Sequence, residues 1–162
     1  MAALYKWLVW DSDGHPSDAY VLSNDLEQSQ GIQEIAEKVI LANPILEDEV
    51  EILGKSIRRR DGKGSLTPLP ARGAAGLHGR TGAFIGFEEC HGFTNYDLIR
   101  AITPDPTRGD VTVWFTSYSP VAAREGIPMH DMLTAARAGK MPRTLLSWYC
   151  GDWSDRSGLP RP

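Results

Sequence analysis

The sequence contains few cysteines and no long hydrophobic run. Only Cys90 and Cys150 occur among 162 residues, which is too few for a disulfide framework. The amino-terminal apolar stretch holds one lysine and is interrupted by Asp11, so it is too short for a signal-peptide core or a membrane span. We therefore expect a cytoplasmic protein with reduced thiols.

Internal repeats are also absent, and the length fits one domain. Apolar periodicity predicts helices over residues 24–44, 95–102 and 128–139, the last ending at Gly139. Strands are predicted over residues 4–10, 19–23, 48–57, 83–87, 110–119 and 143–150. The first two strands would form a hairpin around Asp13-Gly14.

These elements predict an α+β or mixed α/β fold. We expect a single mixed β-sheet of five or six strands, packed with about three helices. Residues 1–150 would form one globular domain and residues 151–162 a carboxyl-terminal tail. Within the domain, residues 58–80 are rich in glycine and proline and are predicted to form a long basic loop, which is unusual in a compact domain.

Basic residues are scarce in the first third of the chain and concentrated immediately after it. Residues 1–54 carry two basic and eleven acidic side chains, whereas residues 55–80 carry seven basic side chains and one acidic. Such a segment favours binding to phosphates or to an acidic protein surface, although a solvated loop has the same composition. The candidate binding residues are Arg58, Arg59, Arg60, Lys63, Arg72 and Arg80.

Cys90 is the first candidate for chemistry, because a thiolate beside a helix amino terminus has a lowered pKa. The surrounding "ECHGFTNY" resembles the Asp-Cys-Ser-Gly-Phe signature of NlpC-type cell-wall cysteine peptidases, and "RGDVTVWF" resembles a later strand of that family. The resemblance implies an amidase or peptidase with Cys90 as nucleophile and His130 as the available base. Glu89 and His91 depart from the signature, and a buried cysteine that packs as a small hydrophobe is the alternative.

The stretch "WLVWDSDGHPSD" gives a second candidate. It resembles the first motif of haloacid-dehalogenase-type phosphatases, which implies a Mg²⁺-dependent enzyme with Asp11 as nucleophile and Asp13 as acid and base. Ser117 and an acidic site at Asp152 and Asp155 would complete it, but their spacing leaves little room for the intervening elements. A hairpin turn at Asp13-Gly14 accounts for the same residues.

Metal-ligand spacings are missing as well. There is no Cys-x-x-Cys and no helical histidine pair, so we expect no structural metal and no cofactor.

Because no catalytic set is complete, the leading interpretation is a small interaction protein of bacterial or phage type, such as an inhibitor, immunity factor or regulatory accessory protein. Its partner would be a protein or, through the basic loop, a nucleic acid.

Overall fold

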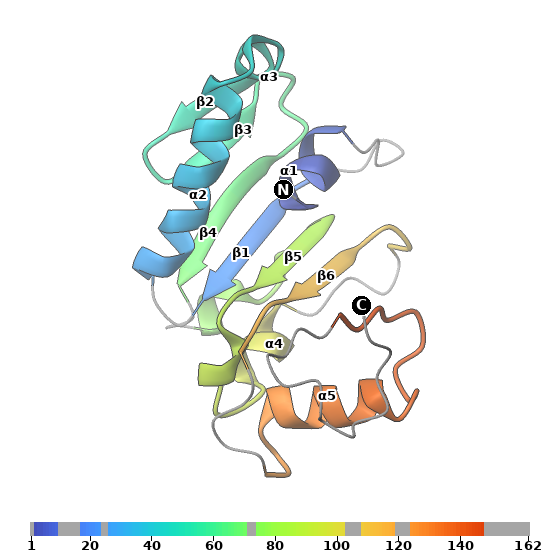
Figure 1. Ribbon diagram of the computed structural model, residues 1–162. Coiled ribbons are helices and arrows are strands. Elements are labelled where there is room, and N and C mark those ends of the chain that lie inside the picture. Colours follow the sequence, from blue (N-terminus) through green and yellow to red (C-terminus); the bar gives the residue numbers. More distant parts are fainter. Residues whose placement is uncertain are drawn as a thin grey trace.

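The computed structural model describes residues 2–9, 17–23, 26–70, 74–102, 108–118 and 124–147. Its centre is a six-stranded sheet with the order β2-β3-β4-β1-β5-β6 (Figure 1). The strands are β1 (Ala19–Ser23), β2 (Val50–Leu53), β3 (Ser56–Arg59), β4 (Ser65–Pro70), β5 (Phe84–Phe87) and β6 (Thr112–Phe115). No helix in the described part of the chain is long and apolar enough to cross a membrane.

The sheet has a parallel half and an antiparallel half. Strands β4, β1, β5 and β6 run parallel to one another, whereas β2 and β3 form an antiparallel hairpin that continues into β4. The mixed sheet with packed helices confirms the predicted fold class.

Helices cover both faces of the sheet. On one face, α1 (Ala2–Leu4), the π-helical turn Tyr5–Val9 and α2 (Leu26–Leu41) belong to the elements that enclose a core. On the other face, the 3-10 turns Ala74–Leu77 and Cys90–Gly92, α4 (Asp97–Ala101) and the half-buried Met129 of α5 (Pro128–Arg137) contribute to a second core. Side chains alternate between these cores along β1, where Val21 belongs to the first and Leu22 to the second.

The amino-terminal segment corrects a prediction. Residues 4–9 are helical and not a strand, so the expected hairpin with residues 19–23 does not form. Ala3, Leu4 and Trp7 are buried while Tyr5 is exposed, which is a helical period that the density of aromatic and β-branched residues obscured. The expected turn at residues 10–16 lies outside the described residues.

The segment after α2 contains more structure than the sequence predicts. Pro44 begins an additional helix, α3 (Pro44–Glu49), because the Asn43 side chain caps it by accepting a hydrogen bond from Ile45 N at 3.2 Å. The predicted strand over residues 48–57 is a hairpin, β2–β3. The predicted long loop includes the end of β3, all of β4 and the 3-10 turn Ala74–Leu77.

The later elements agree better with the sequence. Strands β5 and β6 and helices α4 and α5 lie within the predicted ranges, and Gly139 follows α5 with a φ of +68°. The expected strand over residues 143–150 is wrong for residues 143–147, which have no regular structure and include Leu145 with 92% of its surface exposed. Residues 148–150 and the tail lie outside the described residues.

Candidate functional site

The carboxyl ends of the parallel strands meet at one edge of the sheet (Figure 1). The chain leaving β1 enters α2 on one face, whereas the chain leaving β5 enters α4 on the other. In open sheets of this kind, ligands bind where neighbouring strands send their connections to opposite sides. The edge between β1 and β5 is therefore the candidate functional site.

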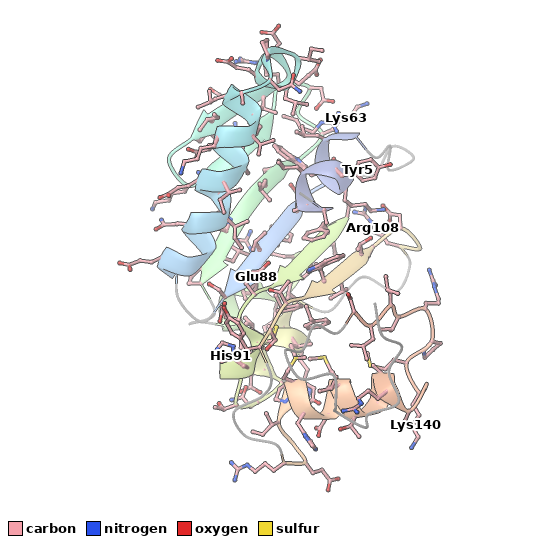
Figure 2. All side chains as sticks on the ribbon, viewed as in Figure 1. Tyr5, Lys63, Glu88, His91, Arg108 and Lys140 are labelled. Atoms are coloured by element: carbon pink, nitrogen blue, oxygen red, sulfur yellow. The ribbon has the colours of Figure 1, made fainter. Side chains whose placement is uncertain are left out.

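Two glutamates stand at this edge. Glu88 and Glu89 follow directly after the fully apolar, buried strand β5, and both are half-buried (Glu88 is labelled in Figure 2). The backbone N–H of Glu88 donates to the carbonyl oxygen of Leu22 at 2.7 Å, so the first carboxylate is fixed at the junction of β5 and β1.

Thr116, the first residue after β6, bonds to Glu88 and to the backbone on either side of the glutamate pair. Its hydroxyl donates a hydrogen bond to the Glu88 carboxylate. Its backbone N–H donates to the Phe87 carbonyl at 2.9 Å, and its own carbonyl accepts from Cys90 N at 3.1 Å. The Glu88 carboxylate and the Thr116 hydroxyl therefore come from the ends of adjacent parallel strands, and the hydrogen bonds between β5 and β6 hold them side by side.

Glu89 has an uncommon backbone conformation. Its φ of 56° and ψ of 40° are left-handed, which costs a residue with a side chain about 1–3 kcal/mol and persists only where the surroundings enforce it. The Glu89 carboxylate lies 3.3 Å from Nδ1 of His91, and the His91 ring meets the Tyr118 ring edge to face at 5.7 Å. The turn at Glu89 ends the extended course of β5, and the second carboxylate lies beside the 3-10 turn Cys90–Gly92 through its approach to His91.

Cys90 does not have the environment of a nucleophile. Its side chain is fully buried in the second core, and its thiol donates to the Phe87 carbonyl at 3.2 Å. Burial, followed by the negative charge of Glu88, raises the pKa of the Cys90 thiol to about 12. The thiolate is therefore negligible at neutral pH, and the negative charges of Glu88 and Glu89 disfavour it further. His130, the expected base, is half-buried on α5.

The residues of the phosphatase hypothesis lie almost entirely outside the described part of the chain. Asp11, Asp13, Asp152 and Asp155 lie outside the described residues. Ser117 is exposed and donates its hydroxyl hydrogen to the Tyr118 carbonyl at 2.7 Å.

The candidate basic residues fall into two groups. Arg58, Arg60 and Lys63 are exposed at the β2–β3 hairpin and the turn after it. Arg59 is held internally: it forms an ion pair with Asp61 at 2.6 Å, which lowers the Asp61 pKa, and donates to the Trp7 carbonyl at 3.0 Å. Arg80 lies over the Tyr20 ring, 5.6 Å from its centroid, and Arg72 lies outside the described residues.

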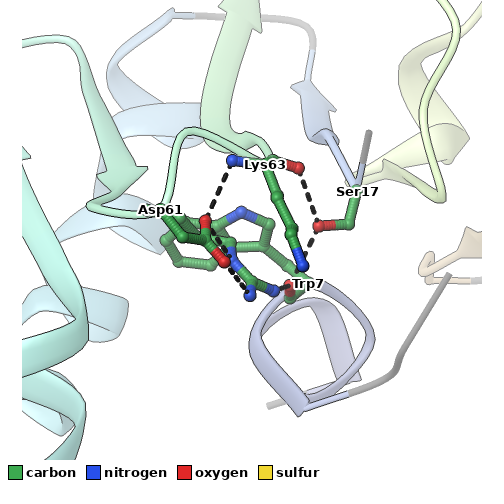
Figure 3. Close-up of polar contacts among 5 residues, drawn as sticks. Trp7, Ser17, Asp61 and Lys63 are labelled. Carbon is green, nitrogen blue, oxygen red and sulfur yellow. Dashed lines mark hydrogen bonds and ion pairs between the residues drawn. The ribbon is translucent and has the colours of Figure 1, made fainter. Parts of the chain in front are cut away.

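The turn that carries Lys63 is fixed to the amino-terminal segment (Figure 3). Ser17 donates to the Lys63 carbonyl from its backbone N–H at 2.8 Å and from its hydroxyl at 3.1 Å. Gly64, with a φ of +148°, passes so close that an added Cβ would lie 2.8 Å from the Ser17 carbonyl carbon. This part of the predicted loop is anchored and cannot wrap freely around a partner.

Among the described residues, no three histidine, cysteine, aspartate or glutamate side chains are grouped as a metal site. A cation at the edge would therefore need ligands from a bound molecule in addition to the glutamates.

The sequence analysis considered Glu89 only as a departure from a peptidase signature and did not single out Glu88 or Thr116. The signal was present: "FIGFEE" is a buried strand followed by paired carboxylates, and "TVWFTS" is a strand followed by hydroxyls.

Comparison with known proteins gives one informative result. No protein-family model and no curated protein matches the sequence. Among solved structures, the large terminase of bacteriophage HK97 is similar, with a TM-score of 0.68 and 15% sequence identity. The match covers 85% of this chain and 29% of the terminase chain, so the similarity concerns the fold of one part of that protein.

Proposed function

We propose that this chain takes part in Mg²⁺-dependent hydrolysis of a nucleoside triphosphate, as part of a terminase-like phage protein. The observation that carries the proposal is the placement of Glu88 and Glu89 at the carboxyl end of β5, with the Thr116 hydroxyl bonded to Glu88. A carboxylate that ends a buried parallel strand beside a hydroxyl is the arrangement that supports Mg²⁺ in nucleotide-hydrolysing sheets.

In this proposal the two glutamates have different roles. Glu88, fixed by Leu22 and Thr116, is the Mg²⁺ ligand. Mg²⁺ commonly takes only one or two protein carboxylates and completes its octahedron with phosphates and water, which agrees with the absence of a larger ligand group among the described residues. Glu89, the next residue, orients the water that attacks the terminal phosphate and accepts the proton that this water loses.

Two further features support the proposal, one at the edge of the sheet and one in the comparison with known structures. Helix α2 begins at Leu26, three residues after β1 ends, so the positive end of its dipole lies near the same edge. The fold similarity to a phage large terminase favours phage over bacterial origin, the two alternatives that the sequence analysis left open. The chain corresponds to 29% of that protein's length, and the activity of the whole is part of the proposal.

Phosphate release from ATP tests the proposal. Purified protein is expected to release inorganic phosphate at a rate that depends on Mg²⁺ and is abolished by EDTA. An equal rate with and without Mg²⁺, or no release above the uncatalysed background, contradicts it.

The interaction function predicted from the sequence remains a proposal for the exposed cations of the β2–β3 hairpin. The sequence prediction favours a protein partner, with nucleic acid as the alternative, and we propose that alternative, DNA, for the exposed Lys55, Arg58 and Arg60. Changing all three to alanine is expected to weaken DNA binding at least tenfold at low salt and to reduce its salt dependence. Fluorescence anisotropy at several salt concentrations measures both effects. Changing the exposed Arg124, Arg137 and Lys140 around α5 is the matched control, and equal losses in both variants would refute a hairpin site.

A further inference from the structure

His91 is a polar residue beside the glutamate pair that the proposed hydrolysis does not yet use. It lies in the 3-10 turn Cys90–Gly92, directly after Glu89 and Cys90. The side chain is half-buried, with 27% of its surface exposed, and Nδ1 approaches a Glu89 carboxylate oxygen to 3.3 Å. Nδ1 itself is buried and forms no hydrogen bond at this geometry within the described part of the chain, so the Glu89 carboxylate is the acceptor nearest to an unsatisfied donor. Figure 2 shows His91 on the segment beyond the end of β5, on the same side of the molecule as Glu88.

Neighbouring groups hold the His91 ring in this place. The turn that carries it is anchored through Cys90, whose N–H donates to the Thr116 carbonyl and whose thiol donates to the Phe87 carbonyl. On its other side the ring meets Tyr118 edge to face. The imidazole is therefore a fixed group, and the carboxylate of Glu89 is the acid that the structure places against Nδ1.

Glu89 needs such a fixed partner. Its backbone is held in a left-handed conformation, but a glutamate side chain has three further rotatable bonds to restrain. A carboxylate that orients water must point in one direction, because a displacement of about 1 Å is enough to reduce a rate about 100-fold.

We propose that His91 is a positioning residue for hydrolysis: a small rotation closes the 3.3 Å approach into a hydrogen bond from Nδ1 to the Glu89 carboxylate, which holds the carboxylate toward the attacking water. This inference rests on the proposed function for its kinetic consequence only. The contact itself belongs to the protein without any ligand.

Two substitutions separate positioning from packing. His91→Phe keeps a ring against Tyr118 and removes both nitrogens, whereas His91→Asn places an amide N–H close to the position of Nδ1. His91→Phe is expected to lower kcat for ATP hydrolysis about tenfold and leave KM within twofold, in the range typical for removing a group that orients a reactive ligand. His91→Asn is expected to recover most of the loss, and His130→Phe on α5 is the control with unchanged kinetics.

A nuclear magnetic resonance measurement decides the contact independently of activity. In the wild-type protein the Nδ1–H resonance of His91 should shift when Glu89 is changed to glutamine and stay in place when Glu125 is changed instead. If the resonance does not shift when Glu89 is changed to glutamine, His91 does not position Glu89. The same follows if His91→Phe and His91→Asn lower kcat equally. If the wild type hydrolyses no nucleotide while the resonance does respond to Glu89, the proposed function fails and the contact stands.

Discussion

Replacing Glu89 with glutamine is expected to slow nucleotide hydrolysis by about 100- to 10,000-fold while leaving the fold and Mg²⁺ binding intact. Removing a positioned general base typically costs a factor of this size, which corresponds to about 3–5 kcal/mol in the activation free energy. Glutamine keeps the length of the side chain and a hydrogen-bonding oxygen, but it cannot accept a proton from water. Steady-state phosphate release measures the change.

The control for this substitution is Glu125→Gln, at an exposed glutamate shortly before α5. It is expected to hydrolyse nucleotide at the wild-type rate. A Glu89→Gln protein that retains more than a tenth of wild-type activity would remove Glu89 from the chemistry, and a similar loss in both variants would show that the effect is one of net charge.

Replacing Trp7 with alanine is expected to lower the free energy of unfolding by about 3–5 kcal/mol, the range found for large aromatic truncations in cores. Trp7 has no exposed surface, and its carbonyl accepts hydrogen bonds from Arg59 at 3.0 Å and from the Ser17 hydroxyl at 3.3 Å. For a domain whose total stability is about 5–15 kcal/mol, this is a large share. Urea denaturation followed by circular dichroism provides the measurement.

Trp114 is the matched control, because it is the same residue type with 47% of its surface exposed at the edge strand β6. Trp114→Ala is expected to cost less than half as much as Trp7→Ala. Equal losses, or a smaller loss at Trp7, would contradict the packing of the amino-terminal helical segment against the sheet.

The parts of the fold that sequence reasoning predicted are those with local signals. Helix α2 shows its buried face through Ala36 and Ile40, and α5 begins at Pro128 and is followed by Gly139. Strand β5 is a short apolar run between breakers, which identifies a buried strand without knowledge of its neighbours.

Strand β4 shows why other elements were missed. Pro68 and Pro70 argue against a strand in the interior of a sheet. Strand β3, however, pairs with β4 only at Ser65 and Leu66, so both prolines lie beyond the described β3 ladder, where β1 is the paired neighbour. That register depends on contacts between distant segments, and it cannot be read from the segment itself.

The candidate site was missed for the same reason. Glu88 and Thr116 are 28 positions apart, and only the parallel pairing of β5 with β6 brings carboxylate and hydroxyl together. The residues next to Cys90 resemble a peptidase signature, which made the thiol a candidate nucleophile. In the fold the thiol is buried, and the neighbouring glutamates stand at the edge of the sheet instead. The local sequence drew attention to this segment, and the tertiary fold determined which of its side chains lie at the edge of the sheet.

Binding of Mn²⁺ in place of Mg²⁺ tests the central claim most directly, because its paramagnetism broadens the amide resonances of residues near the bound ion. In the presence of a non-hydrolysable ATP analogue, the resonances of residues 88–91 and 116–117 are expected to broaden first, and Glu88→Gln should abolish this effect. The claim is contradicted if broadening is unchanged in Glu88→Gln, or if it begins at the exposed acidic residues Glu47, Asp48 and Glu49 of α3.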